Sequence, residues 1–288
     1  MWLDRLDIEA IVDAKLPDTW RVILYFALCF VISWALYFAA SATTVTLART
    51  TLTYLGVFTP GILALLLTYR EGGATALKAL VERLFRWDVG VRWYLFALLF
   101  VLSLKLSVAL ILRLTTGTWP VFGTDPIYLM LAATLFSTIT GGQAGEELGW
   151  RGYALPRLAR SFGLGPASLV IGMIWAAWHL PLFFILGADT NGQSFPFYVI
   201  QVTAISVVAA WLYMKTDGSL LLTMLFHAAV NNTKDIVPSI VPGASNPWEL
   251  HASPVGWLTL GLIWVFAAWC LFDMRRDTFV AQLSPVTP

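Results

Sequence analysis

Charged side chains are scarce in this chain. Lys, Arg, Asp and Glu make up 12% of its 288 residues, hydrophobic residues reach 58%, and mean hydropathy is +0.74. Soluble globular proteins carry about 25% charged residues, so a soluble protein is excluded. At about 20 apolar residues per membrane helix, this content suits about eight spans with little left over. We expect an all-α, polytopic integral membrane protein, a helical bundle formed by one domain over residues 1–288.

Other scarcities exclude further classes of protein. The two cysteines, Cys29 and Cys270, both lie in apolar runs, so neither a disulfide framework nor a cysteine-rich zinc site is available. A net charge of +1 excludes nucleic-acid binding through a basic face. The first 20 residues contain several acidic side chains and no apolar stretch, so a cleavable signal peptide is not expected.

Hydrophobic runs predict the spans. The second contains Pro60–Gly61, which a membrane helix tolerates when neighbouring groups satisfy the freed backbone. The loop at 70–92 has apolar residues at helical spacing, which predicts an amphipathic helix in the cytoplasmic interface. The expected spans are 20–40, 51–68, 93–112, 126–140, 166–186, 195–214, 219–230 and 254–272.

The distribution of Lys and Arg predicts the orientation. With eight spans, 14 of the 18 basic residues fall on the side that holds both termini, and three fall on the other side. Lys105 lies within a span. Cytoplasmic loops are enriched in Lys and Arg, so we expect both termini and the loop that carries Arg151 on the cytoplasmic side. The membrane is expected to be the cell membrane.

Three polar motifs interrupt the apolar second half of the chain. A charge at the centre of a bilayer costs at least about 2.5–3.5 kcal/mol, so such residues need partners or a function. His251, in a predicted outer loop, receives no role. The motifs are Glu146-Glu147-x-x-x-Arg151, Trp175-x-x-x-His179 and His227-x-x-x-Asn231.

Helical spacing separates the two adjacent carboxylates. Glu147 and Arg151 are four residues apart and are expected to form an ion pair, which leaves Glu146 free for chemistry. His227 and Asn231 are also four apart and can address one point. A carboxylate with a histidine can activate water, and histidine and asparagine donors can stabilise an oxyanion, which suffices for peptide-bond hydrolysis.

A metal is the alternative chemistry. Glu146, His179 and His227 are candidate ligands for a divalent ion such as zinc, whose bound water would attack the substrate. The sequence contains no HExxH motif, so the zincin version of this hypothesis has no support.

The ordered trio resembles the CPBP family, the CAAX-protease and bacteriocin-processing membrane proteins also called Abi proteins. The resemblance covers residues 126–232, with 1–125 and 233–288 as flanking helices and loops. It departs at Trp175, where the family commonly has Phe. The resemblance implies an intramembrane endopeptidase whose chamber opens to the cytoplasm and whose substrates are CAAX-like, prenylated or other membrane-associated peptides.

The resemblance also implies roles for the motif residues. Glu146 would activate water with His179, and His227 and Asn231 would form the oxyanion site. Glu147, Arg151 and Trp175 would support this arrangement. Family members are often labelled metalloproteases, whereas some are argued to be glutamate proteases.

Two other functions remain open. Relatives also act as catalytically silent scaffolds or bacteriocin-immunity proteins, and intramembrane polar residues also occur in ion or proton transporters. One geometric difficulty remains as well, because Glu146 falls at the end of its apolar run while His179 and Asn231 lie deep in theirs. The fourth helix must therefore extend beyond that run and place Glu146 beside a water-filled cavity.

Overall fold

A computed structural model describes residues 18–239 and 246–275, which form helices and loops without a β-strand among them. The elements are α2 (Asp18–Ala42), α3 (Thr46–Glu82), η1 (Arg83–Phe85), α4 (Val91–Thr116), α5 (Ile127–Thr140), α6 (Gln143–Glu147), η2 (Leu148–Ala154), α7 (Leu155–Phe162), α8 (Leu164–Trp178), η3 (Leu180–Phe183), α9 (Phe195–Lys215), α10 (Leu220–Thr233), η4 (Lys234–Ile236) and α11 (Pro254–Met274).

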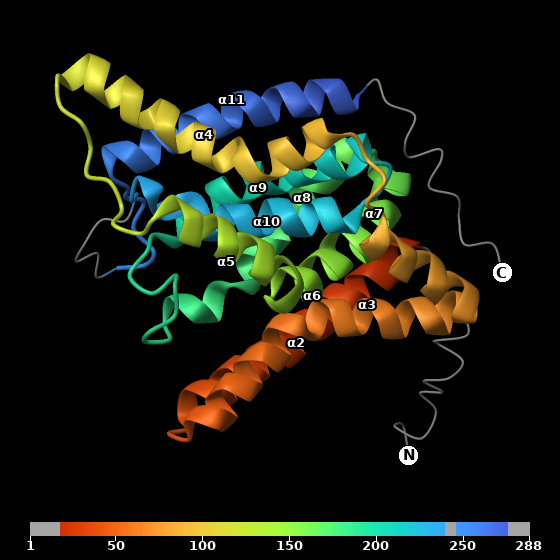
Figure 1. Cartoon of the computed structure of the whole chain (residues 1–288). Helices are drawn as coiled ribbons and strands as arrows, with labels where there is room; N and C mark the ends of the chain where they lie inside the picture. Colours follow the sequence, from red (N-terminus) through yellow and green to blue (C-terminus); the bar gives the residue numbers. More distant parts are fainter. Residues whose placement is uncertain (1–17, 240–245, 276–288) are drawn as a thin grey trace.

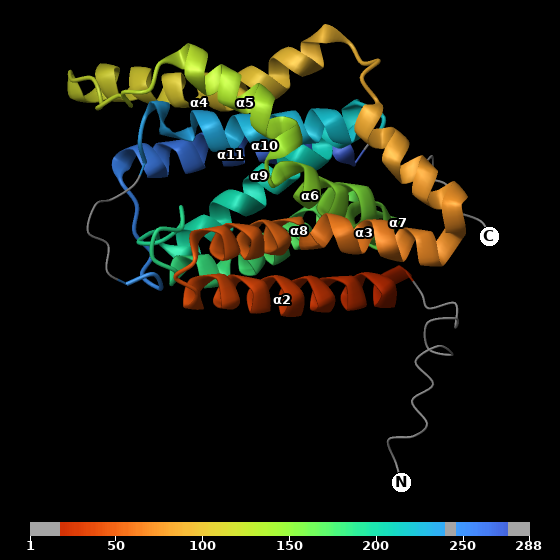
Figure 2. The same ribbon diagram turned by 60° about the horizontal axis from the view of Figure 1, so that its bottom comes forward.

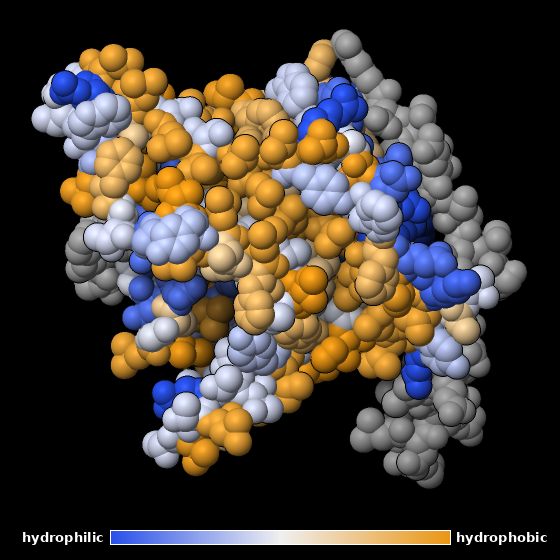
Figure 3. All heavy atoms as spheres, in the orientation of Figure 1, coloured by the Kyte–Doolittle hydropathy of each residue, from blue (hydrophilic) through white to orange (hydrophobic). Residues whose placement is uncertain are grey.

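Five of these helices, α2, α3, α4, α9 and α11, are long and apolar enough to cross a membrane. The helices from α5 to α7 form a bent path that makes a sixth candidate. The predicted spans 166–186 and 219–230 correspond to α8 and α10, which have 15 and 14 residues, so a count of eight is not confirmed. The chain is nevertheless an all-helical, multi-pass integral membrane protein. Figure 3 shows hydrophobic side chains over the middle of one face and hydrophilic ones toward its margins.

Helices α9 and α10 form the centre of the bundle (Figure 1). Helix α8 packs against α9, helices α4 and α5 pack against α10, and α11 packs against α9. Every residue from Val202 to Met214 of α9 is buried. Helices α2 and α3 form an antiparallel pair along one side of the bundle (Figure 2). The core therefore lies between this pair and the α4–α11 side.

Helix α3 is longer than its predicted span and contains two irregularities. Pro60 has no N–H to donate to the carbonyl of Gly56, and Ser33 Oγ of α2 donates to that oxygen at 2.9 Å. This is the backbone compensation expected for a membrane helix. A kink at Gly72–Gly73, with φ +62° at Gly73, then turns the predicted amphipathic segment. That segment is helical, and its Leu80 is buried in the protein.

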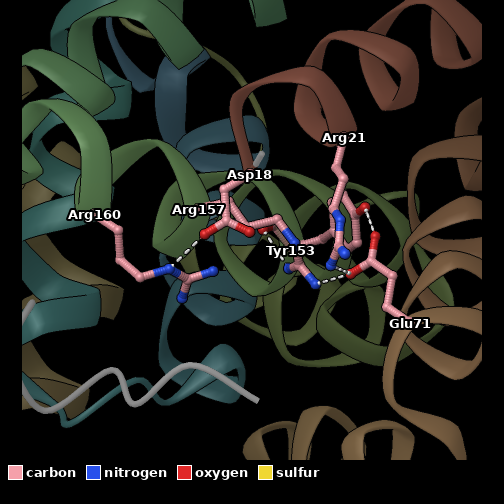
Figure 4. Close-up of polar contacts among 6 residues, drawn as sticks. All are labelled: Asp18, Arg21, Glu71, Tyr153, Arg157 and Arg160. Carbon is pink, nitrogen blue, oxygen red and sulfur yellow. Dashed lines mark hydrogen bonds and ion pairs between the residues drawn. The ribbon is translucent and has the colours of Figure 1, made fainter. Parts of the chain in front are cut away.

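Ion pairs fasten together one end of the bundle (Figure 4). Glu71 of α3 accepts a hydrogen bond from Tyr153 at 2.5 Å and pairs with Arg157 at 2.5 Å and with Arg21 at 3.7 Å. Arg160 pairs with Asp18 at 2.7 Å. These contacts join α2, α3, η2 and α7 at one end of the bundle. Helix α9 finishes and α10 begins at the same end, where Arg86 donates to the carbonyl of Asp217. We call this the basic end.

Candidate active site

The helical path of the fourth predicted span continues beyond residue 140. Helix α5 stops at Thr140, the chain bends by 54°, and α6, the π-helical η2 and α7 carry it on to Phe162. Glu146 therefore lies inside the bundle, which removes the difference in depth between it and the histidines. Arg151 is not in a cytoplasmic loop as predicted. It lies in η2 with 0% of its surface exposed.

Glycines let this segment contact the backbone of α3 directly. A Cβ atom on Gly61 would lie 2.7 Å from the carbonyl oxygen of Gly145, and a Cβ on Gly145 would lie 2.9 Å from Cα of Phe58. A larger side chain would have to push the two backbones apart, because packed interiors contain little free space. The backbone of α3 thus fixes the position of the segment that carries Glu146.

Glu147 is fully buried and links two motifs. Arg151 Nη1 donates to its Oε1 at 2.8 Å, so the predicted ion pair is present although the segment from Leu148 onward is π-helical. His227 Nδ1 lies 3.0 Å from the same oxygen. A carboxylate only accepts hydrogen bonds, so His227 donates from Nδ1 and its Nε2 is left for other partners. Glu147 therefore orients His227, a contact that helical spacing alone did not predict.

Glu146 has a different hydrogen-bond partner from Glu147. Trp175 Nε1 donates to its Oε2 at 2.6 Å. The Trp175 ring also lies against the guanidinium of Arg151, with 4.7 Å from Cζ to the ring centroid. The indole thus contacts Arg151 and holds one oxygen of Glu146.

His179 terminates α8, where Pro181 follows and a 3₁₀ turn replaces the helix. The predicted span 166–186 is therefore wrong after residue 178. His179 Nδ1 lies 2.9 Å from the carbonyl oxygen of Trp175. A carbonyl only accepts, so Nδ1 carries the hydrogen, and Nε2 of a neutral ring is an acceptor.

The motifs meet in one chamber with a volume of about 360 Å³. Its wall includes Glu146, Trp175, His179, His227 and Asn231. The ring centroids of Trp175 lie 6.1 Å from His179 and 5.0 Å from His227. Asn231 follows His227 by one helical turn of α10 and is exposed. Residues separated by more than 80 positions along the chain are thus brought to one cavity.

Known proteins are similar in sequence to this part of the chain. The family model described as Type II CAAX prenyl endopeptidase Rce1-like matches residues 123–233, which contain all three motifs. A protein named CAAX prenyl protease 2, from Methanococcus maripaludis, is 24% identical, and the alignment covers 74% of this chain and 84% of that protein. Both similarities support the CPBP family and a membrane protease, an intramembrane endopeptidase.

A metal centre needs three or more protein ligands close to one point. Among residues 18–239 and 246–275, no three His, Cys, Asp or Glu side chains are grouped to hold one ion. The Nδ1 atoms of both histidines and Oε2 of Glu146 are engaged, which leaves Nε2 of each ring and Oε1 of Glu146 as the available donors. Glu146, His179 and His227 are not grouped closely enough to hold one ion in this arrangement.

Several residues of the chamber wall were not predicted from the sequence. Gln201 of α9 is a polar residue within an apolar span, so the criterion that identified His179 also applied to it. Tyr198 and the 187–190 loop carry no such signal. His251, which received no role, lines a separate small cavity. The additional wall residues with polar side chains are Thr53, Asp189, Thr190, Gln193, Tyr198, Gln201 and Lys234.

The chamber is built at the end of the bundle opposite the basic end. Asp189, Thr190 and Gln193 belong to the loop before α9, and Lys234 directly follows α10. Helix α9 reaches the basic end only at Lys215. The chamber and the basic end therefore lie at opposite ends of the bundle.

Proposed function

We propose that this protein hydrolyses a peptide bond in the chamber, with water activated by Glu146. The observation that supports this proposal is the meeting of one carboxylate, two imidazoles and a carboxamide on one cavity wall. A general base must reach the proton that it removes. Glu146 and His179 Nε2 both provide acceptors at the chamber, so a water held between them is oriented for attack.

The remaining groups stabilise the charge that develops. Water adds to the carbonyl carbon of the substrate while Glu146 takes its proton, and the carbonyl oxygen becomes an oxyanion. Asn231 donates to that oxyanion from its amide. His227 donates from Nε2 in its imidazolium form, for which Glu147 is the counter-charge. When the tetrahedral intermediate collapses, the C–N bond breaks and Glu146 returns the proton to the leaving amine.

The substrate class follows from the family. The relative is named a CAAX prenyl protease, and the chamber lies within a membrane protein. We therefore propose that the substrate is a membrane-associated peptide, of which a prenylated CAAX-like C-terminus is one form. Glu147, Arg151 and Trp175 are positioning residues, because they act through His227 and Glu146.

Cleavage of a fluorogenic peptide by purified protein in liposomes tests the proposal. Glu146→Gln should lower turnover by at least about 10²–10⁴-fold, the usual contribution of general acid–base catalysis. Glu82→Gln is the matched control, because it makes the same change on an exposed side chain far from the chamber. Equal turnover by both variants would overturn the role of Glu146. Absence of cleavage by the wild type would support a silent scaffold, and Glu146-dependent ion flux without cleavage would support a transporter.

A further inference from the structure

A second cavity adjoins the chamber. It has a volume of about 670 Å³ and shares Thr53, Leu182, Gly187 and Ala188 with the chamber wall. Its other residues come from the end of α2, the start of α3 and the segment that follows η3. The proposed reaction uses none of these residues. A peptide that is cleaved beside Glu146 therefore has room to extend beyond the chamber.

One face of α3 connects the catalytic carboxylate to this second cavity. Arg49, Thr53 and Val57 follow one another at intervals of four residues, so their side chains lie on the same side of the helix. Val57 marks the level of Glu146, because a Cβ atom on Gly142 would meet Val57 Cγ1 and would lie 3.5 Å from Glu146 Oε1. Thr53 lines both cavities, and Arg49 lines the second one. This row therefore leads from the reacting groups to a guanidinium.

The length of this row corresponds to a short peptide. Val57 follows Arg49 by eight positions, which is about 12 Å along a helix that rises about 1.5 Å per residue. An extended peptide covers about 3.3–3.6 Å per residue. A segment of about three residues therefore reaches from a bond beside Glu146 to Arg49.

Arg49 has hydrogen-bond donors to offer a ligand. Its Nε and Nη2 donate to the carbonyl of Thr43 at 3.3 and 2.9 Å, which holds the side chain at the turn between α2 and α3. Within the described part of the chain, no carboxylate pairs with Arg49, whereas Lys234 of the chamber wall pairs with Asp235 at 2.6 Å. Arginine is well suited to bind a carboxylate through parallel N–H groups. In a peptide, the terminal carboxylate is such a group whatever the sequence.

The other end of the row offers a hydroxyl. Tyr37 of α2 lines the second cavity with 1% of its surface exposed, and its Oη has no hydrogen-bond partner among the described residues. The ring packs against α3, where a Cβ atom on Gly56 would lie 2.6 Å from Tyr37 Cε1. Gly56 directly precedes Val57, so this ring lies near the level of Glu146. A buried hydroxyl without a partner is costly, so it suits a carbonyl group of a bound peptide backbone.

The wall between these polar groups is largely apolar. Phe38, Phe184 and Leu186 line the second cavity, and their side chains are exposed. Covering such surface with apolar side chains is favourable. The occupant that matches the whole wall is therefore a short apolar peptide with a terminal carboxylate. A hydrocarbon chain would match the apolar residues but not the guanidinium of Arg49.

We propose that the second cavity binds the leaving part of the substrate and that Arg49 binds its terminal carboxylate. The inference rests on the proposed function, because it places the bond that breaks beside Glu146. Arg49 then selects substrates that are cleaved about three residues from their C-terminus, and Tyr37 holds the backbone next to that bond. Both residues determine specificity by binding the substrate, and neither takes part in proton transfer.

Peptide binding tests the inference without cleavage. Purified Glu146→Gln protein in detergent is mixed with a fluorescent apolar peptide that ends either in a free carboxylate or in an amide, and anisotropy gives both dissociation constants. The acid should bind about tenfold more tightly, because charge-assisted hydrogen bonds are the stronger ones. Arg49→Gln on the same background should remove this preference, and Arg49→Lys should restore part of it.

Two further variants sharpen the binding experiment. Arg113→Gln is the matched control, because it makes the same change at an exposed arginine that lines neither cavity. Tyr37→Phe should weaken the acid and the amide alike, by about threefold, because its hydroxyl is assigned to the peptide backbone. Equal affinity of Glu146→Gln protein for the two peptides would overturn the inference. An acid preference that persists in Arg49→Gln, or that Lys234→Gln removes instead, would also overturn it.

Turnover separates this inference from the proposed function. With Glu146 present, Arg49→Gln should raise KM for the acid peptide about tenfold with little change in kcat, and KM for the amide should stay the same. Equal cleavage of acid and amide by the wild type would overturn the inference and leave the protease intact. An acid preference in binding that depends on Arg49, without cleavage of either peptide by the wild type, would overturn the proposed function alone.

Discussion

The basic end and the chamber end of this bundle use charged side chains in opposite ways. At the basic end, each charge of the network binds an oppositely charged partner from another helix, as Arg160 does with Asp18 and Arg157 with Glu71. At the chamber end, Glu146 has an indole partner and His179 a backbone carbonyl. Charges that bind one another stabilise the fold, whereas those held by neutral groups retain capacity to bind water and substrate.

Glu147 and Arg151 lie between these two regions and share features of both. They form an ion pair like those of the basic end, but both side chains are at most 1% exposed. Glu147 also orients His227 of the chamber. This buried pair therefore couples stability to catalysis.

Removal of Arg151 should have the largest effect on the fold. Arg151→Ala leaves Glu147 as a buried charge without its cation, and such losses cost about 3–5 kcal/mol. Arg160→Ala, on the same helical path, breaks a partly exposed pair and should cost about 0–1 kcal/mol. Thermal unfolding in detergent measures both. Equal melting temperatures for the two variants would remove the distinction between the buried pair and the basic end.

Replacement of His227 should affect catalysis rather than folding. His227→Ala removes one oxyanion donor, which typically costs about 10²–10³-fold in kcat. His227→Gln restores a neutral N–H donor and should recover part of that loss, because the proposed role is donation from Nε2. If both variants were equally inactive at wild-type stability, His227 would have to act in another way, such as by accepting a proton.

A smaller effect is expected from the contact between α3 and α6. Gly145→Ala introduces a Cβ at 2.9 Å from Phe58 Cα, and overpacking of this kind costs about 1–3 kcal/mol. Gly261→Ala is the matched control, because a Cβ there meets nothing within 4 Å. If kcat for Gly145→Ala falls by more than the loss of folded protein accounts for, the contact between the two backbones positions Glu146.

Part of this arrangement was predictable from the sequence. The apolar content predicted a helical membrane protein, and polar residues in apolar runs identified Glu146, His179, His227 and Asn231, all of which line the chamber. These signals are local, because a charged or polar group in a membrane span is costly wherever it lies. The ion pair between Glu147 and Arg151 was likewise predicted from spacing along one helix.

The remaining features depend on tertiary contacts. The bend after Thr140 falls at Gly141–Gly142, and α6 then packs against α3. The hydropathy of the segment does not show that the helical path continues, so the sequence assigned Arg151 to a loop. The contact of His227 with Glu147 joins residues 80 positions apart, and no periodicity encodes it.

The smallest effect is expected from removal of metal ions. Among the described residues, no three His, Cys, Asp or Glu side chains are grouped to hold one ion, and Trp175 occupies one oxygen of Glu146. We therefore expect turnover in liposomes to change less than about twofold after exhaustive chelation, because the proposed reaction uses protein groups alone. Loss of activity that added zinc restores, together with zinc in elemental analysis of the wild type but not of His179→Ala, would instead assign Glu146, His179 and His227 to a metal centre. The chamber end would then differ from the basic end in binding an ion rather than a water molecule.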